Sequence, residues 1–254
     1  MKSVLRFLGL LLLATLALQL YFVARIAAMA VVNPESTAFQ RSEAWLIASQ
    51  KHDLAWRQQW VPYAQISDHL KRAVIASEDA TFVDHEGIDV EALEKAWDRN
   101  AKEDAKAEQR AAQLAPKKPN ANANPPKAAK PPKIIGGSTI TQQLAKNLFL
   151  SGERTLLRKG QELVLTVTLE TLLSKQRILE IYLNSVEWGE GVFGAEAAAQ
   201  HYFRKPASKL SAFEAARLAV MLPRPKYFET RPSSGYLNSR ASTIVARMGG
   251  VELP

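Results

Sequence analysis

The hydrophobic positions of this chain begin with one long apolar run at the N-terminus. Lys2 and Arg6 precede an uncharged, leucine-rich stretch over residues 7–24, and a second apolar stretch covers residues 26–32. The 18 residues of the first stretch, at about 1.5 Å each, span about 27 Å, close to the hydrocarbon thickness of a bilayer. The run therefore predicts a single transmembrane helix, with residues 1–32 forming a cytoplasmic stub and an anchor.

A cleaved secretory signal is the alternative interpretation of this run, because residues 28–30 (Ala-Met-Ala) have the small-x-small pattern of a cleavage site. The apolar core of a signal peptide usually has about 7–15 residues, and this one is longer, which favours a retained anchor. Lys2 and Arg6 keep the N-terminus in the cytoplasm by the positive-inside rule. We therefore expect a single-pass protein of the cytoplasmic (inner) membrane, with its main domain in the periplasm.

The remaining chain shows the periodicity of helices. Apolar residues between Ile66 and Val74 recur at the spacing of one helical face, which ends near Ser77. A longer helical pattern covers residues 156–183, with one break near Ser174. No segment shows the strict alternation of a strand, so the pattern predicts a mainly α domain.

Capping signals predict where two further helices begin. Thr139 with Gln142, and Ser211 with Glu214, have the spacing of capping boxes. The second of these helices is expected to end at Pro223, which is unfavourable inside a helix.

Composition narrows the chemistry. The chain has 254 residues, 47% of them hydrophobic, with four histidines and no cysteine. Thiolate zinc sites, iron–sulfur clusters, disulfides and a cysteine nucleophile are therefore excluded. Any catalysis must depend on carboxylates, hydroxyls or basic groups.

The formal charge of +8 is concentrated in one segment, residues 99–133, which holds nine basic and three acidic residues. This segment is rich in Ala, Lys and Pro and lacks aromatic residues, a composition that predicts a disordered insertion. The insertion divides one domain, formed by residues 33–98 and 134–254. Its positive charge is consistent with a solvated linker or with attraction to anionic membrane lipid, and it does not indicate a nucleic-acid partner.

Three charged clusters carry candidate chemistry, and the first covers residues 77–89. Glu78 lies among other acids and close to Phe82, so its pKa is expected to rise toward the range of a general base. The alternative is a solvated acidic loop with a structural histidine. The candidate residues here are Glu78, Asp79, Phe82 and His85.

The second cluster, over residues 136–147, places hydroxyls and amides at a helix start and a lysine one turn later. Free N–H groups and the helix dipole attract a phosphate at such a position. An ordinary capped helix is the alternative. The candidate residues are Ser138, Thr139, Gln142, Gln143, Lys146 and Asn147.

The third cluster consists of Arg154, Arg158, Lys159 and Glu162. An exposed pair such as Arg158 with Glu162 contributes only about 0.2–0.5 kcal/mol, which does not account for three cations near one acid. Binding of a diphosphate leaving group does account for them.

These clusters, in this order behind an anchor, resemble the motifs of the peptidoglycan glycosyltransferases (murein transglycosylases, glycosyltransferase family 51). The resemblance spans Ile66 to Met221 and includes two further blocks, residues 178–184 and 191–199. The chain ends soon afterwards, without room for a transpeptidase domain, which suggests the monofunctional biosynthetic type.

The resemblance implies a lysozyme-like helical domain that polymerises lipid II into β-1,4-linked glycan by inverting transfer, with release of undecaprenyl diphosphate. It implies that Glu78 is the general base and that Glu162 assists departure of the diphosphate, directly or through Mg²⁺ or Mn²⁺. No cofactor is implied to be obligatory. The remaining candidates are implied to bind substrate, and the cations among them the diphosphate: Asp79, Phe82, His85, Ser138, Thr139, Gln142, Gln143, Lys146, Asn147, Arg154, Arg158 and Lys159.

Two departures from the family pattern and two rival functions accompany this interpretation. The insertion is expected to lie outside the cleft and to leave activity intact, and Gln161 replaces a basic residue found in some members.

A lytic transglycosylase has no need of the cation cluster, and a non-catalytic scaffold has no need of both glutamates. Glu180 is assigned no catalytic role, whereas Tyr182 and Asn184 fit either role. Expected partners are lipid II, the growing glycan, membrane lipid and other cell-wall synthesis and division proteins.

Overall fold

A computed structural model describes residues 2–51, 55–114, 137–150 and 155–254. Within them the chain forms two compact units, which are described separately. Residues 1–88 together with 139–254 form the first unit, and residues 89–138 form the second.

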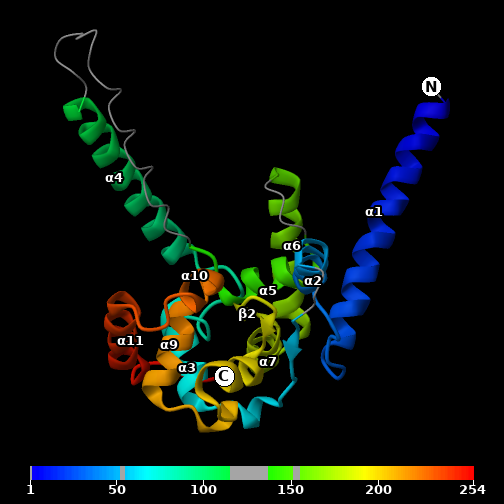
Figure 1. Cartoon of the computed structure of the whole chain (residues 1–254). Coiled ribbons are helices and arrows are strands. Elements are labelled where there is room, and N and C mark those ends of the chain that lie inside the picture. Colours follow the sequence, from blue (N-terminus) through cyan, green and yellow to red (C-terminus); the bar gives the residue numbers. More distant parts are fainter. Residues whose placement is uncertain (1, 52–54, 115–136, 151–154) are drawn as a thin grey trace. The chain divides into compact units, whose positions relative to one another are not determined.

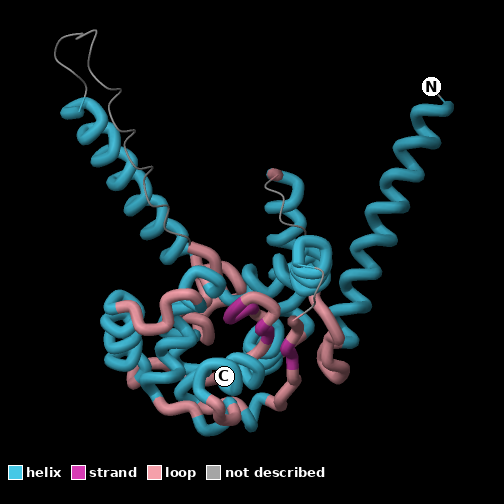
Figure 2. The backbone as a smooth tube through the Cα atoms, viewed as in Figure 1, coloured by secondary structure: helices cyan, strands magenta, loops and turns pink. Residues whose placement is uncertain are grey.

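Helices dominate the described residues (Figures 1 and 2), so the predicted mainly α fold is confirmed. The helices are α1 (Lys2–Ala28), α2 (Ala38–Lys51), α3 (Asp68–Glu78), α4 (Val90–Leu114), α5 (Ile140–Phe149), α6 (Leu156–Leu172), α7 (Lys175–Ser185), α8 (Ala195–Phe203), α9 (Ala212–Met221), α10 (Pro225–Glu229) and α11 (Gly235–Met248). Two single 3₁₀ turns, at Tyr63–Gln65 and Ala207–Lys209, and three strands, β1 (Arg57–Gln58), β2 (Glu187–Gly189) and β3 (Val192–Phe193), complete the description.

The core of the first unit is built on α3, which packs against α9 and α11 (Figure 1). Leu70 and Val74 of α3, Leu218 of α9 and Leu237 of α11 have no exposed surface. Helix α5 contacts α2, α6 and α7. The apolar face predicted between Ile66 and Val74 is therefore the face that α3 buries, and Glu78 is the last residue of this helix.

The predicted helix boundaries agree with the structure. Thr139 and Gln142 form a capping box at α5, and Ser211 and Glu214 form one at α9. Helix α6 ends at Leu172 and Ser174 is the N-cap of α7, which is the predicted break.

The sequence did not predict the small sheet, whose strand order is β1-β3-β2. Arg57 pairs in parallel with Val192, and its N–H donates to the carbonyl of Gly191 at 2.8 Å. Trp56 stacks on Phe193 with ring centroids 4.5 Å apart. Strands of two or three residues are too short to show an alternating pattern of apolar and polar positions. The sequence therefore contained no local signal from which the sheet could have been predicted.

Helix α4 differs from the prediction of disorder over residues 99–133. Residues 99–114 belong to this helix, and residues 115–133 lie outside the described part of the chain. Ala, Glu, Lys, Arg and Gln are strong helix formers, and the Glu91–Lys95 pair has the i,i+4 spacing that supports a helix. The low hydrophobicity that suggested disorder is equally typical of a solvated helix.

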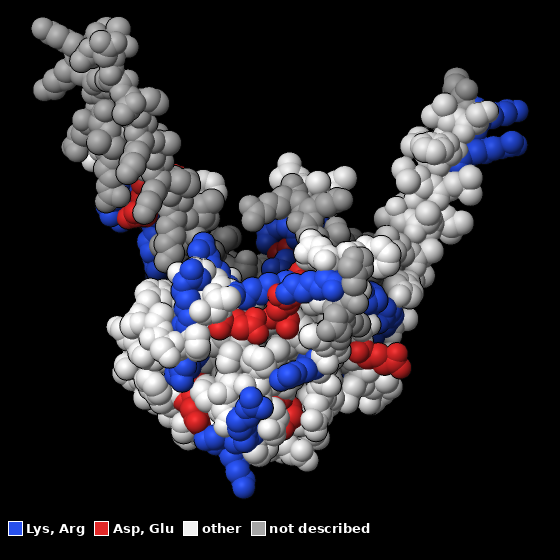
Figure 3. Space-filling view, viewed as in Figure 1, with Lys and Arg blue, Asp and Glu red and all other residues white. Residues whose placement is uncertain are grey.

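Helix α1 extends over 27 residues and has a mean hydropathy of 2.2 in its most apolar window, so it is long and apolar enough to cross a membrane. Its surface is uncharged over most of its length, with basic groups at its N-terminal end (Figure 3). Ile26 and Met29 are 0% and 4% exposed in the core of the first unit. Cleavage after Ala30 would remove both side chains from this core, which favours the retained anchor.

Candidate active site

Glu78 lies at the C-terminal end of α3 and is partly buried. Its Oε2 accepts a hydrogen bond from Nε2 of Gln143 at 3.1 Å. Burial raises the pKa of Glu78, hydrogen bonds from Gln143 and Ser77 oppose the shift, and the charge of Asp79 adds to it. The expected rise in the pKa of Glu78 is therefore found in the structure, with burial as its main cause, and the role of Glu78 as a general base stays a prediction.

Tyr182 connects this carboxylate to the core. Its hydroxyl donates to Oε1 of Gln143 at 2.9 Å, and the ring is 1% exposed. Burial raises the pKa of Tyr182 well above its usual value, so the phenol stays protonated and remains a donor. A chain of hydrogen bonds from Tyr182 through Gln143 thus orients Glu78.

Of the two residues whose role the sequence left open, Tyr182 therefore supports the candidate base, and Asn184 is structural. The Asn184 side chain accepts from the N–H of Val61 at 2.9 Å and donates to its carbonyl at 3.0 Å. Glu180 forms an ion pair with Arg177 at 2.9 Å.

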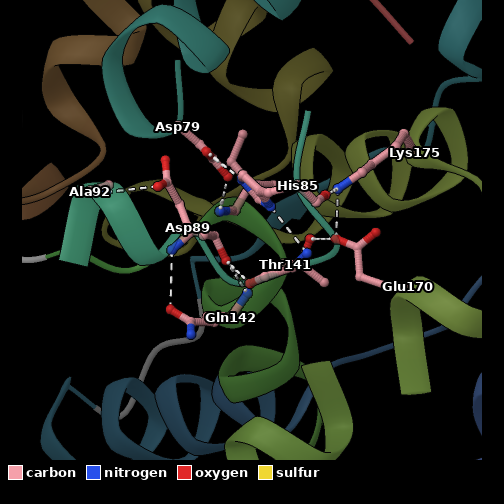
Figure 4. Close-up of polar contacts among 11 residues, drawn as sticks. Asp79, His85, Asp89, Ala92, Thr141, Gln142, Glu170 and Lys175 are labelled. Atoms are coloured by element: carbon pink, nitrogen blue, oxygen red, sulfur yellow. Dashed lines mark hydrogen bonds and ion pairs between the residues drawn. The ribbon is translucent and has the colours of Figure 1, made fainter. Parts of the chain in front are cut away.

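Asp79 and His85 hold the acidic loop of residues 79–88 against the start of α5 (Figure 4), and the Phe82 ring packs edge-on against His85 within this loop. Asp79 Oδ1 lies 2.8 Å from His85 Nε2, and Oδ2 accepts the N–H of Ile140 at 2.9 Å. His85 Nδ1 accepts the N–H of Gly87 at 3.0 Å, which places the ring proton on Nε2, facing Asp79. The Asp79 side chain is 2% exposed and Phe82 is 0% exposed. These residues therefore position the loop, and their contact with substrate stays a prediction.

Three residues that the sequence did not single out brace the same loop (Figure 4). Lys175 Nζ donates to the carbonyl of His85 and lies 2.9 Å from Glu170 Oε1. Thr141 donates to the same Glu170 oxygen at 2.6 Å. Glu170 and Lys175 are five positions apart across the break between α6 and α7, a spacing that no helical pattern would have revealed.

At the start of α5, backbone N–H groups are hydrogen-bonded to side chains of the chain itself. Thr139 accepts from the N–H of Gln142 at 3.2 Å and donates to the carbonyl of Gly87 at 2.6 Å. Because Asp79 also takes the N–H of Ile140, two of the N–H groups predicted to bind a phosphate are occupied. The prediction of a free N–H cradle is therefore wrong, and a carboxylate of the chain itself lies at the positive end of the helix dipole.

Ser138 and Asn147 lie on the accessible surface of this region. Ser138 is exposed and Asn147 is partly exposed. Within the described ranges no side-chain hydrogen bond engages either residue. Both therefore stay candidate ligands for substrate.

The cations of the third cluster surround Glu162, which is 4% exposed on α6. Arg158 Nη1 lies 2.8 Å from Glu162 Oε2, and Lys159 pairs with Oε1. Loss of hydration lowers the pKa of Lys146 on α5, the charge of Glu162 raises it, and Arg158 and Lys159 lower it. Three cations near one carboxylate leave an excess of positive charge.

Arg158 also has an unused donor. Its Nε is buried and has no hydrogen-bond partner in the described structure. A buried donor of this kind is unfavourable unless a ligand accepts from it. Arg154, the fourth predicted cation, lies outside the described residues.

Glu162 does not fit a divalent cation in this arrangement. Both of its oxygens are paired with cations, and the residues around it are Lys and Arg. Mg²⁺ and Mn²⁺ bind preferentially to clusters of oxygen ligands, and positively charged side chains nearby weaken the binding of either ion. No step through a metal is therefore derived.

Comparisons with known proteins identify the family of this chain. The family described as "Transglycosylase" matches residues 46–111 and 122–249, so the unmatched segment between them is shorter than the predicted insertion. A relative named biosynthetic peptidoglycan transglycosylase, from Burkholderia thailandensis, is 54% identical over 241 residues, which are 95% of this chain and 84% of the relative. A Paraburkholderia xenovorans protein of the same name is 51% identical over 242 residues, 95% of this chain and 90% of its own. Because the match extends over most of its length, the chain belongs to the transglycosylase family.

Proposed function

We propose that this chain is a membrane-anchored glycosyltransferase that polymerises lipid II into peptidoglycan strands and releases undecaprenyl diphosphate. The names of its relatives, biosynthetic peptidoglycan transglycosylases, support the reaction class. The site supports the assignment of roles. Helix α1, with basic residues at its N-terminal end, supports an anchor whose N-terminus is cytoplasmic and whose domain is periplasmic.

The observation that carries the proposal is that one helix, α5, joins the candidate base to the cation cluster. Gln143 of α5 binds Glu78. Lys146, three positions later and so on the same face of the helix, lies within the electrostatic reach of Glu162, Arg158 and Lys159. Helix α5 thus links the candidate base at the end of α3 to the cations of α6, and transfer from a lipid diphosphate needs both groups close to the donor.

In the proposed reaction, the Glu78 carboxylate accepts the proton of the acceptor sugar's 4-hydroxyl. The oxygen attacks the anomeric carbon of the donor, and the bond from that carbon to the diphosphate breaks. Attack on the face opposite the leaving group converts an α-linked diphosphate into a β-linked glycoside. The raised pKa of Glu78 makes its carboxylate a stronger base than an exposed glutamate.

The leaving diphosphate takes up the electron pair, and its charge has to be stabilised. Arg158, Lys159 and Lys146 supply fixed positive charge, and Arg158 Nε supplies a donor without a competing partner. Preorganised donors of this kind stabilise a transition state more than they stabilise the substrate. We propose that Glu162 holds the Arg158 and Lys159 side chains in position and that no divalent cation is required.

The decisive experiment is polymerisation of labelled lipid II by the detergent-solubilised full chain and its Glu78→Gln variant. We expect polymer from the wild type, and a rate reduced by at least about a hundredfold in the variant, because the amide cannot take the proton. Glu86→Gln is the matched control, since Glu86 is an exposed acid on the same loop. It should keep the wild-type rate.

Other outcomes would contradict parts of this proposal. Shortening of preformed strands, without elongation, would indicate a lytic enzyme. No polymer from folded wild-type protein, with or without divalent ions, would indicate a scaffold. Loss of the rate in EDTA, restored by Mg²⁺ or Mn²⁺, would show that an ion displaces Arg158 or Lys159 from Glu162.

A further inference from the structure

The C-terminal half of α1 has one face that packs against the rest of the first unit. Lys2 to Leu18 are exposed throughout, whereas Gln19, Phe22, Arg25 and Ile26 of α1, and Met29 directly after it, are partly or fully buried. Four of these positions, Gln19, Phe22, Ile26 and Met29, follow the i, i+3, i+7, i+10 spacing of a single helical stripe. The membrane helix is thus attached through a defined face.

Apolar and polar contacts both fix this attachment. The Phe22 ring meets Phe149 of α5 edge-on, with centroids 5.3 Å apart. Arg177 of α7 donates from Nε to the carbonyl of Met29 at 2.7 Å. The C-terminal end of α1 and the residues directly after it are therefore held by contacts with α5, α7 and the hydrophobic core.

Gln19, the outermost residue of this stripe, forms a reciprocal amide pair with Gln161 of α6. Gln19 Nε2 donates to Gln161 Oε1 at 2.8 Å, and Gln161 Nε2 donates to Gln19 Oε1 at 3.2 Å. Gln19 lies inside the uncharged apolar run of residues 7–24. A polar side chain in such a segment is unfavourable without a partner, and amide pairs between membrane helices satisfy it.

The other side of this pair is a part of α6 with few other supports. Leu156 and Leu157 are 92% and 88% exposed, and Glu162 is the first buried residue of the helix. Among the described residues, the two hydrogen bonds of the Gln161–Gln19 pair are the only side-chain hydrogen bonds that join residues 156–161 to another element. The same turns carry Arg158 and Lys159.

We propose that Gln19 and Gln161 form an amide clamp through which the membrane helix holds the first turns of α6, and with them Arg158, Lys159 and Glu162, in catalytic position. Both glutamines are positioning residues, since neither is assigned a contact with substrate. The inference rests on the proposed function, because its effect on rate is measured as lipid II polymerisation. Its structural half, the contact between α1 and α6, is testable without activity.

Thiol crosslinking tests the contact directly, since the chain has no cysteine of its own. The full chain in detergent carries Q19C and Q161C, and a bis-methanethiosulfonate reagent with an ethylene spacer is added. We expect rapid intramolecular crosslinking. The matched control is L20C with Q161C, because Leu20 is 68% exposed on another face of α1, and it should crosslink much more slowly.

Kinetics then test the positioning role. We expect Gln19→Ala and Gln161→Ala each to lower kcat by about threefold to tenfold, because either change removes both interhelical hydrogen bonds of the pair. KM for lipid II should stay unchanged, and the unfolding temperature should fall by no more than about 4 °C. The double variant should be no slower than either single variant, because both remove the same contact. Leu20→Ala should match the wild type, and crosslinking of the Q19C/Q161C variant should restore its kcat.

Several results would overturn the clamp. Equal crosslinking of the L20C control would show that α1 is not held by this face, and intermolecular crosslinking by Q19C alone would show that Gln19 pairs with a second copy. Additive losses, or wild-type kcat in both alanine variants, would show that the pair does not position α6. If the wild type itself makes no polymer while Q19C/Q161C crosslinks, the clamp exists as a contact but the proposed function fails, and with it the positioning role.

Discussion

At Glu78, the environment that suits the proposed general base also has a cost to stability. Burial is the main cause of its raised pKa, and the hydrogen bond from Gln143 compensates only part of it. An acid with a raised pKa in the folded state binds its proton more tightly there than in the unfolded chain. The folded state is therefore penalised at every pH at which the unfolded chain has lost that proton.

This balance leads to the first prediction. The penalty is absent below the ordinary pKa of 4.5 and grows as the pH rises above it. The Glu78→Gln variant should therefore unfold at a denaturant concentration equal to or higher than that of the wild type at pH 7.5. Near pH 4 the variant should have no advantage in stability over the wild type. The polymerisation rate of the wild type should fall as the pH drops through the folded pKa of Glu78. Lower stability of the variant at pH 7.5 would contradict the assigned cause of the shift.

The proposed role of Arg158 in binding the diphosphate is expected to depend on the planar shape of its guanidinium group as well as on its charge. Arg158→Lys keeps a cation near Glu162 but removes the buried Nε donor that has no partner in the described structure. We predict a loss of about tenfold in kcat, since a lysine cannot replace the planar donor set of an arginine. Lys159→Arg is the matched control and should stay within about threefold of the wild type. Equal effects of the two exchanges would mean that only charge matters.

Glu187 on β2 is a buried acid outside the proposed chemistry. Burial raises its pKa to about 7, Lys226 lowers it, and Glu43 and Glu229 raise it. The wild type should therefore lose stability between pH about 4.5 and about 7, amounting to about 1–3 kcal/mol at pH 8. Glu187→Gln should lack this slope in denaturant unfolding from pH 5 to pH 8. An unchanged slope would assign the titration to another group.

At the scale of elements, the small sheet depends on one glycine. Gly191 has a φ of +69°, and an added Cβ would lie 1.9 Å from the carbonyl oxygen of Ala55. Gly191→Ala should reduce the free energy of unfolding by more than about 2 kcal/mol, because both the left-handed backbone and the close approach disfavour a side chain. Gly249→Ala, which meets no atom within 4 Å, should change it by less than about 0.5 kcal/mol.

At the scale of the whole molecule, α1 is exposed over residues 2–18 and packs on one side against the core over the rest of its length. Deleting residues 2–18 removes only exposed positions, whereas deleting residues 2–32 also removes the buried Ile26 and Met29. We predict that the shorter deletion keeps the wild-type unfolding temperature and that the longer one lowers the free energy of unfolding by roughly 3–5 kcal/mol. Equal stability of the two truncated proteins, measured in the same detergent, would show that the packing of Ile26 and Met29 contributes little.

The sequence by itself determined the features that depend on neighbours along the chain. Helix starts at Thr139 and Ser211, the break at Ser174 and the apolar run of α1 are all written in residues no more than a few positions apart. The resemblance of the three clusters to a known family identified the candidate residues. Composition alone led to a prediction of disorder for residues 99–114, which form part of helix α4. The polar and charged residues of this segment cannot form a hydrophobic core, but they favour a solvated helix.

Only the tertiary structure decided which of these residues touch. Asp79 takes the N–H of Ile140 across 61 positions, Lys175 reaches the carbonyl of His85 across 90, and Gln19 meets Gln161 across 142. No local pattern encodes such pairs, because hydrogen-bond geometry depends on how the helices pack. Helix propensity and caps act within one turn, whereas the positions of the base, its supports and the cation cluster are set by contacts between elements that folding brings together.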